Sequence, residues 1–114
     1  MFCRKTWIMP TYMIIESKVK DKAKYQQYIL KVPGTVKPFG GRYLARGNNV
    51  IPLLGEWKPE RMIILEFPSK ENIFRWLSSP QYQMIKTLRE EGAETQAIII
   101  EGEVDLDRQY WKMG

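Results

Sequence analysis

Apolar, β-branched and aromatic residues gather in short runs along the chain, and Gly, Pro, Asn and charged residues separate these runs. Runs of this length and composition are typical of β-strands. The run that contains Pro52 is expected at an edge of the sheet, because proline has no N–H to donate to a neighbouring strand. Gly47-Asn48-Asn49 predicts a turn before it, since Gly and Asn tolerate positive φ. The expected strands are residues 12–19, 42–46, 50–54, 61–67 and 95–104.

Three segments between these strands begin at residues that cap helices. Asp21 and Ser69 are suitable N-caps, and Ser79 followed by Pro80 combines a hydroxyl cap with proline at the first helical position. Pro33-Gly34 is expected to break or kink the first helix, and Gly92 is expected to end the third. The first helix is expected to run through Tyr25, Tyr28 and Ile29, and the second through Ile73, Phe74 and Leu77. In the third, Tyr82, Ile85 and Leu88 form an apolar stripe at helical spacing.

The elements follow one another in the order β-α-β-β-α-β, which predicts an α+β domain of the ferredoxin-like type with an antiparallel sheet. A chain of 114 residues fits a single domain, which we place at residues 9–104. Residues 1–8 are expected to be an N-terminal extension from an upstream start codon or a cloning remnant, because Met9-Pro10-Thr11 resembles a second start. Residues 105–114 form a polar C-terminal tail.

Two of the expected strands contain continuous apolar runs, Ile63-Ile64-Leu65 and Ile98-Ile99-Ile100. An antiparallel sheet with one face in water would instead alternate apolar and polar residues. The helices of this fold cover only one face of the sheet, so the other face must also be buried. A second copy of the chain is the simplest cover. We therefore predict a homodimer in which two sheets pack face to face.

The amino-acid composition excludes several kinds of functional site but does not identify one. The chain contains no histidine and one cysteine, Cys3, so an internal disulfide is excluded and most metal, haem and nucleophile-triad sites lack their usual residues. No cofactor is expected. The net charge of +5 is spread along the sequence, which favours a solvated surface over a polyanion-binding patch. No apolar stretch approaches the ~20 residues that span a bilayer. The lone cysteine fits a cytoplasmic protein.

Several blocks of sequence, in this order and at this spacing, characterise a family of small proteins. The blocks are Gly40–Gly47, Glu56–Pro59, Leu65–Ser69, Ser79–Tyr82 and Leu88-Arg89. Through these blocks the chain resembles the domain-of-unknown-function family 1330 (DUF1330) of the dimeric α/β-barrel superfamily. The resemblance extends from Pro10 to about Glu103. The resemblance implies a ferredoxin-like protomer and a dimer whose two sheets form a barrel, but no particular activity. Superfamily relatives include cofactor-free monooxygenases, muconolactone-type isomerases and haem enzymes, and the haem enzymes use a histidine ligand that this chain lacks.

Without histidine, acid–base catalysis would depend on Glu, Asp, Tyr or Lys. Glu66 follows an apolar run, so it needs a cationic partner, for which Arg42, Arg46 and Arg61 are the nearest candidates. Glu66 and Arg42 are accordingly candidate catalytic residues, and the alternative is a structural ion pair. Glu56 is a third candidate acid or base, or else a partner of a nearby cation.

Arg42 and Arg46 lie four residues apart on one expected strand, so they should share a face, with Tyr43 on the opposite face. Such a pair could bind a carboxylate or phosphate through bidentate hydrogen bonds. Alternatively, the two charges protect an edge strand from pairing with other proteins.

Four residues are candidates for binding a ligand: Arg46, Trp57, Arg61 and Tyr82. Trp57 lies in an expected loop, where its ring is open to a ligand or to a dimer partner. Trp76 is better explained by core packing because aromatic side chains bury large areas. Tyr25 and Tyr28 share a helical face, and we expect them to pack with their hydroxyls at the surface.

Three classes of function remain open on these residues. The first is a cofactor-free enzyme, of the isomerase or monooxygenase type, that acts on a small organic compound. The second is a non-catalytic ligand-binding or stress-response module, which the lack of a clear acid–base pair favours. The third is RNA binding, since RNA-recognition domains share this topology. Arg61–Phe67 lacks the stacking aromatics that those domains display, which argues against nucleic acid as a partner.

Overall fold

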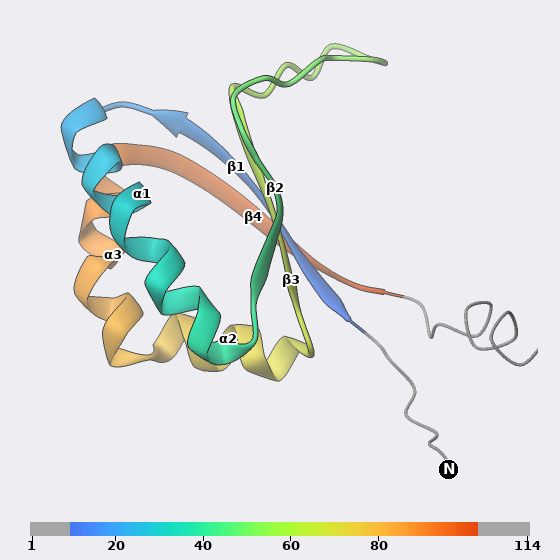
Figure 1. Cartoon of the computed structure of the whole chain (residues 1–114). Helices are drawn as coiled ribbons and strands as arrows, with labels where there is room; N and C mark the ends of the chain where they lie inside the picture. Colours follow the sequence, from blue (N-terminus) through green and yellow to red (C-terminus); the bar gives the residue numbers. More distant parts are fainter. Residues whose placement is uncertain (1–9, 103–114) are drawn as a thin grey trace, which may run out of the picture.

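The computed structural model describes residues 10–102, which form a four-stranded antiparallel sheet with three α-helices packed on one face (Figure 1). The expected order β-α-β-β-α-β is confirmed, with two short helices at the second helical position. The expected extension 1–8, the tail 105–114, Cys3 and the last two residues of the expected strand 95–104 lie outside the described residues. The elements are β1 (Thr11–Val19), α1 (Lys22–Val36), a 3₁₀ turn (Lys37–Phe39), β2 (Arg42–Gly47), β3 (Arg61–Phe67), α2 (Lys70–Ser78), α3 (Pro80–Gly92) and β4 (Ala93–Glu101).

The strands lie in the order β2-β3-β1-β4, and every neighbouring pair is antiparallel. Ile14 of β1 lies opposite Ile64 on one side and Ile98 on the other. The sheet is open and is not closed into a barrel within the described chain. Its odd-numbered residues in β1, β3 and β4 face the helices, whereas the even-numbered residues form an uncovered face that we call the open face.

Local capping explains where the helices begin. The side chains of Asp21, Ser69 and Ser79 accept hydrogen bonds from backbone N–H groups three residues further on, as the sequence predicts. Each cap satisfies one of the free N–H groups of a first turn. Pro80 occupies the first turn of α3, where its missing N–H costs no hydrogen bond. No helix in the described part of the chain is both long and apolar enough to cross a membrane.

The predicted break at Pro33-Gly34 is wrong, because α1 continues through both residues to Val36. Proline removes a single helical hydrogen bond here. Its neighbours Val32, Thr35 and Val36 are buried in the core. The Thr35 Oγ1 also donates a hydrogen bond of 2.7 Å to the carbonyl of Val32. Burial of this face therefore outweighs the poor helix propensity of Pro and Gly.

The predicted strand 50–54 is also wrong, since residues 48–60 contain no strand. The chain does not reverse at Gly47-Asn48-Asn49. Instead, both limbs of the β2–β3 connection run out beyond the sheet (Figure 1). We call residues 48–60 the arm. Its apolar side chains Ile51, Leu53 and Leu54 are exposed, so no second strand or core within the described chain is available to order a strand there.

Gly92 ends α3, as predicted, and it does so at a close contact with α1. A Cβ atom at this position would lie 2.8 Å from the backbone nitrogen of Tyr25, whereas a Cβ atom at the helical Gly34 would meet nothing within 4 Å. The Gly92 carbonyl also accepts hydrogen bonds from the N–H groups of Lys20 and Asp21. The helix therefore ends where the backbones are too close for any side chain.

We expect Gly92→Ala to lower the free energy of unfolding by about 1–3 kcal/mol, because the new methyl group forces α1 and α3 apart. Gly34→Ala should raise it by about 0.4–1 kcal/mol, since alanine restricts the unfolded chain and fits the helix without strain. Urea denaturation of both variants measures the difference. Equal effects of the two substitutions would contradict the close approach at Gly92.

Candidate functional site

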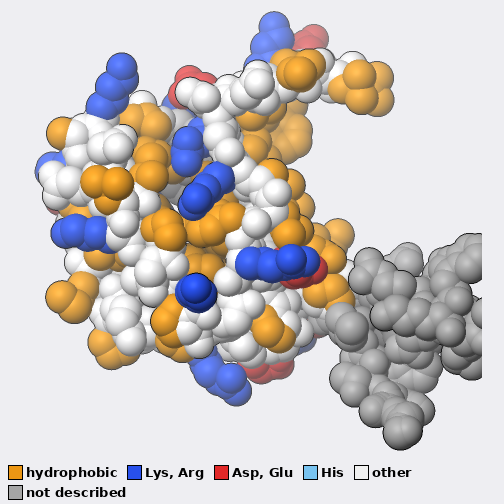
Figure 2. Space-filling model, viewed as in Figure 1, with side chains coloured by type: hydrophobic (Ala, Val, Ile, Leu, Met, Phe, Trp, Pro, Cys, Tyr) orange, Lys and Arg blue, Asp and Glu red, His pale blue; other side chains and the backbone are white. Residues whose placement is uncertain are grey.

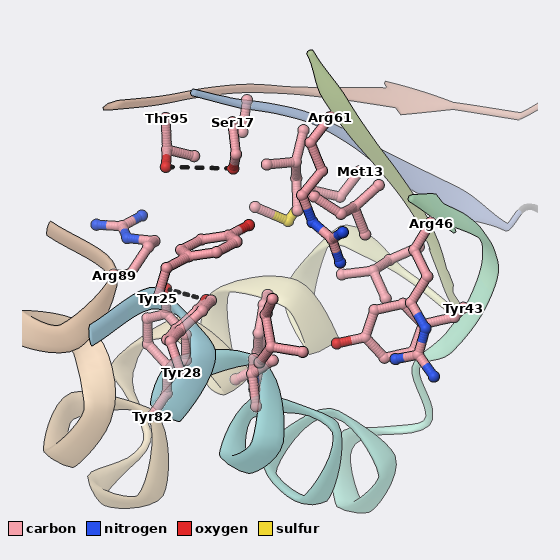
Figure 3. Close-up of a pocket in the computed structure, with 17 residues that line it drawn as sticks. Met13, Ser17, Tyr25, Tyr28, Tyr43, Arg46, Arg61, Tyr82, Arg89 and Thr95 are labelled. Atoms are coloured by element: carbon pink, nitrogen blue, oxygen red, sulfur yellow. Dashed lines mark hydrogen bonds between the residues drawn. The ribbon is translucent and has the colours of Figure 1, made fainter. Parts of the chain in front are cut away.

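A pocket of about 50 Å³ lies between the helix-facing side of the sheet and helices α1 and α3 (Figure 3). Its floor is apolar, with Met13, Ile15 and Ile63 from the strands and Val32 from α1. Its polar groups are mainly tyrosine and arginine side chains. Figure 2 shows the corresponding hollow, in which hydrophobic side chains are surrounded by Lys and Arg side chains.

Two tyrosines from different helices form a hydrogen-bonded pair in the pocket. The hydroxyls of Tyr28 in α1 and Tyr82 in α3 are 3.1 Å apart, and both residues are buried. The expectation that the Tyr28 hydroxyl lies at the surface is therefore wrong. Burial raises the pKa of Tyr28 well above its ordinary value of 10.0, and the neighbouring Tyr82 raises it further. Tyr28 is consequently a neutral phenol that can donate or accept a hydrogen bond at any physiological pH.

This raised pKa makes stability depend on pH at the alkaline end. The folded state keeps the Tyr28 proton where the unfolded chain, with a tyrosine pKa of about 10, loses it. The stabilisation is complete below pH 10 and is lost as the pH rises above that value, by up to about 1.4 kcal/mol per pH unit for one group. We expect Tyr28→Phe to reduce this slope in urea denaturation between pH 9 and 11. An identical alkaline slope in the variant and the wild type would contradict the assignment.

Three arginines line the same pocket, and no Asp or Glu among the described residues lines it. The guanidinium of Arg46 lies 4.2 Å from the ring centre of Tyr43, and that of Arg61 lies 5.8 Å from the ring centre of Tyr25. The Nε atoms of Arg61 and Arg89 are buried without a hydrogen-bond partner. Figure 3 shows Arg46 and Arg61 on one side of the pocket and Arg89 on the other. The pocket is therefore positively charged.

The prediction that Arg42 and Arg46 share a face is wrong because β2 contains a bulge. The pairing of β2 with β3 shifts between Tyr43 and Ala45, so that Leu44 is an extra residue. One inserted residue reverses the alternation of side chains beyond it. Arg46 and Tyr43 therefore both line the pocket, and Arg42 lies on the open face of the sheet.

Glu66 pairs with Arg42 on the open face, away from the pocket. The two residues are opposite each other in the β2–β3 register, and the Arg42 Nε donates to the Glu66 Oε1 at 2.7 Å. Arg61 extends to the helix side, so it is not a partner of Glu66. This geometry fits the structural alternative for Glu66, an exposed ion pair that contributes little stability.

The remaining candidates lie on the arm. Trp57 is exposed, and its Nε1 donates to the Glu16 Oε2 at 3.3 Å. It borders a shallow hollow of about 240 Å³ on the open face, together with Ile14, Met62 and Ile98. Glu56 is exposed beside it and lines neither pocket. Of the seven candidates, the structure thus brings together Arg46, Arg61 and Tyr82.

Sequence reasoning did not single out Arg89, Tyr28 or Tyr43 as pocket residues. One signal was available in α3, where positions 82, 85 and 89 lie on one helical face. Tyr43 lies on the face opposite Arg42, as the alternation predicts, but nothing in the sequence showed that this face carries the pocket. Ser17 and Thr95, whose hydroxyls are 3.4 Å apart at the pocket wall, occupy ordinary strand positions without a motif. In the described part of the chain, no cluster of His, Cys, Asp or Glu is suited to a metal ion.

Comparison with known proteins identifies a family and a fold. A family model described as "Domain of unknown function (DUF1330)" matches residues 10–103. No curated protein matches the chain significantly. Among solved structures, protein RPA0582 of unknown function from Rhodopseudomonas palustris has a TM-score of 0.71 at 16% identity, with 82% of each chain covered.

Two further structures are similar in fold. A dimeric ferredoxin-like protein of unknown function from Thermobifida fusca has a TM-score of 0.59 at 12% identity, covering 81% of this chain and 90% of that one. SnoaB from Streptomyces nogalater, described as a cofactor-independent oxygenase, has a TM-score of 0.61 at 9% identity, covering 86% and 97%. At these identities the similarity shows the ferredoxin-like fold alone.

Proposed function

The chain belongs to the DUF1330 family, whose description names no activity, so we propose its function from the site. We propose that each protomer binds a small organic molecule in the pocket between the sheet and helices α1 and α3. The observation that carries this proposal is the pocket's composition, an apolar floor with several polar groups converging on it. Ligand sites in proteins commonly combine these two features. A single structural role would not require so many polar side chains around a hollow.

We propose that the protein is a cytoplasmic homodimer. The open face presents a continuous apolar surface made of Ile14, Ile64, Ile98 and Ile100, of which Ile98 is 62% exposed and Ile100 is 53% exposed. Contiguous apolar patches of this kind mark interaction surfaces. The dimeric state described for the Thermobifida fusca protein supports a second copy as the partner. Two sheets packed through their open faces would also leave both helix-side pockets accessible.

A cofactor-free enzyme, of the isomerase or monooxygenase type, is the second candidate. The likeness to SnoaB supports it at the level of fold, and the neutral phenol of Tyr28 beside Tyr82 supports it at the level of the site. The pocket offers hydrogen-bond donors and positive charge, which stabilise anionic forms of a bound compound. No carboxylate of the described residues lines it to act as a base. This balance of groups favours binding over turnover.

Protein NMR with single-ring probes tests the binding proposal. We expect benzyl alcohol or benzoate to shift, in a saturable manner, the amide signals of residues that line the pocket. Ala97→Leu should weaken this binding because Ala97 lies at the pocket on the helix side of β4. Gln96→Leu, one residue away on the open face, is the matched control and should leave it unchanged. Binding by neither probe, or shifts that Ala97→Leu does not affect, would refute the proposal.

Mass spectrometry of the probes after incubation distinguishes the two candidates. Recovery of bound probes without any change in mass or isomer composition supports a binding module. A new product that forms only with the wild-type pocket, and not with Ala97→Leu, supports the enzyme.

A further inference from the structure

We propose that the ligand of the pocket is an organic carboxylate with a flat apolar body, and that Arg46 and Arg61 bind its carboxylate. This inference rests on the proposed binding function and goes beyond it by assigning the chemical class of the ligand. Three observations carry it: the unpaired arginines, the bulge in β2 and the aromatic walls of the pocket.

The first observation is uncompensated positive charge. Neither Arg46 nor Arg61 forms an ion pair with a carboxylate of the described residues, whereas Arg42 on the same sheet is paired with Glu66. The Nε of Arg61 is buried without a hydrogen-bond partner. Arg61 is half-buried, whereas Arg46 is exposed, so the cost of a buried N–H that makes no hydrogen bond falls on Arg61. A bound anion would remove this cost and compensate the charge of both arginines.

The second observation is the bulge at Leu44. Without the extra residue, regular alternation would place Arg46 on the open face with Arg42. The bulge turns Arg46 to the pocket, where it joins Arg61 of the adjacent strand. Bulges often occur next to functional sites, where they redirect a side chain. At the pocket Arg46 stays exposed and lies 4.2 Å from the ring centre of Tyr43, so its guanidinium is open to an incoming anion.

The third observation concerns the rest of the ligand. The remaining walls of the pocket are largely aromatic or apolar, with Tyr25, Tyr28 and Trp76 among them. Flat walls of this kind suit a ring. A carboxylate matches the planar fork of a guanidinium and is less costly to move into such surroundings than a doubly charged phosphate. These properties together favour a single-ring carboxylate over an inorganic or organic phosphate.

Three probes of similar shape test the assignment: benzoate, benzyl alcohol and phenyl phosphate. We expect benzoate to bind the wild type at least tenfold more tightly than benzyl alcohol, which lacks the charge, and more tightly than phenyl phosphate. Arg61→Gln and Arg46→Gln should each weaken benzoate binding about tenfold or more, as expected for loss of a charge-assisted hydrogen bond. Both substitutions should change benzyl alcohol binding by less than about threefold, since the ring contacts remain.

Arg42→Gln is the matched control, because it removes an arginine from the same strand but from the open face. It should leave benzoate binding unchanged. Arg61→Lys and Arg46→Lys provide variants that keep the charge should a glutamine variant fail to fold, and they should retain part of the preference for benzoate.

The outcomes separate this inference from the proposed function. Equal binding of benzoate and benzyl alcohol, with both weakened by Ala97→Leu, would overturn the carboxylate assignment and leave the pocket as a site for small molecules. Tighter binding of phenyl phosphate would overturn the choice of carboxylate. Benzoate binding that Arg42→Gln weakens as much as Arg61→Gln would reflect general surface charge and would also overturn the assignment. If none of the probes binds in the pocket, the proposed function fails as well.

Discussion

Ile98→Glu is expected to convert the proposed homodimer into monomers. Ile98 lies on β4 opposite Ile14 of the central strand β1, in the middle of the apolar open face. It is exposed in the protomer, so glutamate is solvated in the monomer but becomes buried in the dimer. In an isologous interface the substitution occurs twice, and both charges are desolvated without a partner. We expect the dimer dissociation constant to rise by at least a hundredfold, measured by sedimentation at micromolar concentrations.

Two controls make this result specific. Ile98→Val keeps the surface apolar and should preserve the dimer. Met84→Glu places the same charge on the exposed side of α3, away from the open face, and should also preserve it. A monomeric wild type, or an Ile98→Glu variant that remains dimeric, would show that another surface or no surface joins the protomers.

Trp76→Ala is expected to have the largest effect on stability, with a loss of about 3–5 kcal/mol. Trp76 is 1% exposed, and its ring centre lies 5.5 Å from that of Phe67 and 4.8 Å from that of Tyr82. Its Nε1 donates a 2.9 Å hydrogen bond to the Thr35 Oγ1. Alanine would leave a cavity where the sheet and helices α1, α2 and α3 meet. Because the free energy of unfolding of a native protein is only about 5–15 kcal/mol, the variant should be close to unfolding.

Phe74→Ala is the matched control on the same helix. Phe74 is 54% exposed, so its replacement should change the free energy of unfolding by no more than about 0.5 kcal/mol. Trp76→Phe should lose less than Trp76→Ala because part of the ring packing remains. Urea denaturation of the three variants measures these differences. Similar losses for Trp76→Ala and Phe74→Ala would mean that Trp76 is not the centre of the core.

The sequence determined the three helices, the four strands of the sheet and their order, because the signals for these elements are local. Ser69 and Ser79 each cap the helix that follows, and their effect depends on residues within one turn. The continuous run in β3 similarly placed that strand at residues 61–67, with both its ends as observed. The apolar character of both sheet faces was also visible in sequence, as the exposed isoleucines of β4 show. The resemblance to the DUF1330 family followed from blocks of the same chain.

Tertiary structure decided which of these side chains meet. The extra residue in β2 is defined only by pairing with β3, so no pattern within β2 could show that Arg46 faces the pocket and Arg42 faces away from it. The helical course of α1 through Pro33 likewise depends on burial of Val36 in a core that sequence does not display. The arm lacks the expected strand because a strand needs a partner, and residues 48–60 pair with no strand of the described chain. Local signals are encoded within a few residues, whereas pairing and burial depend on residues that are far apart in the chain.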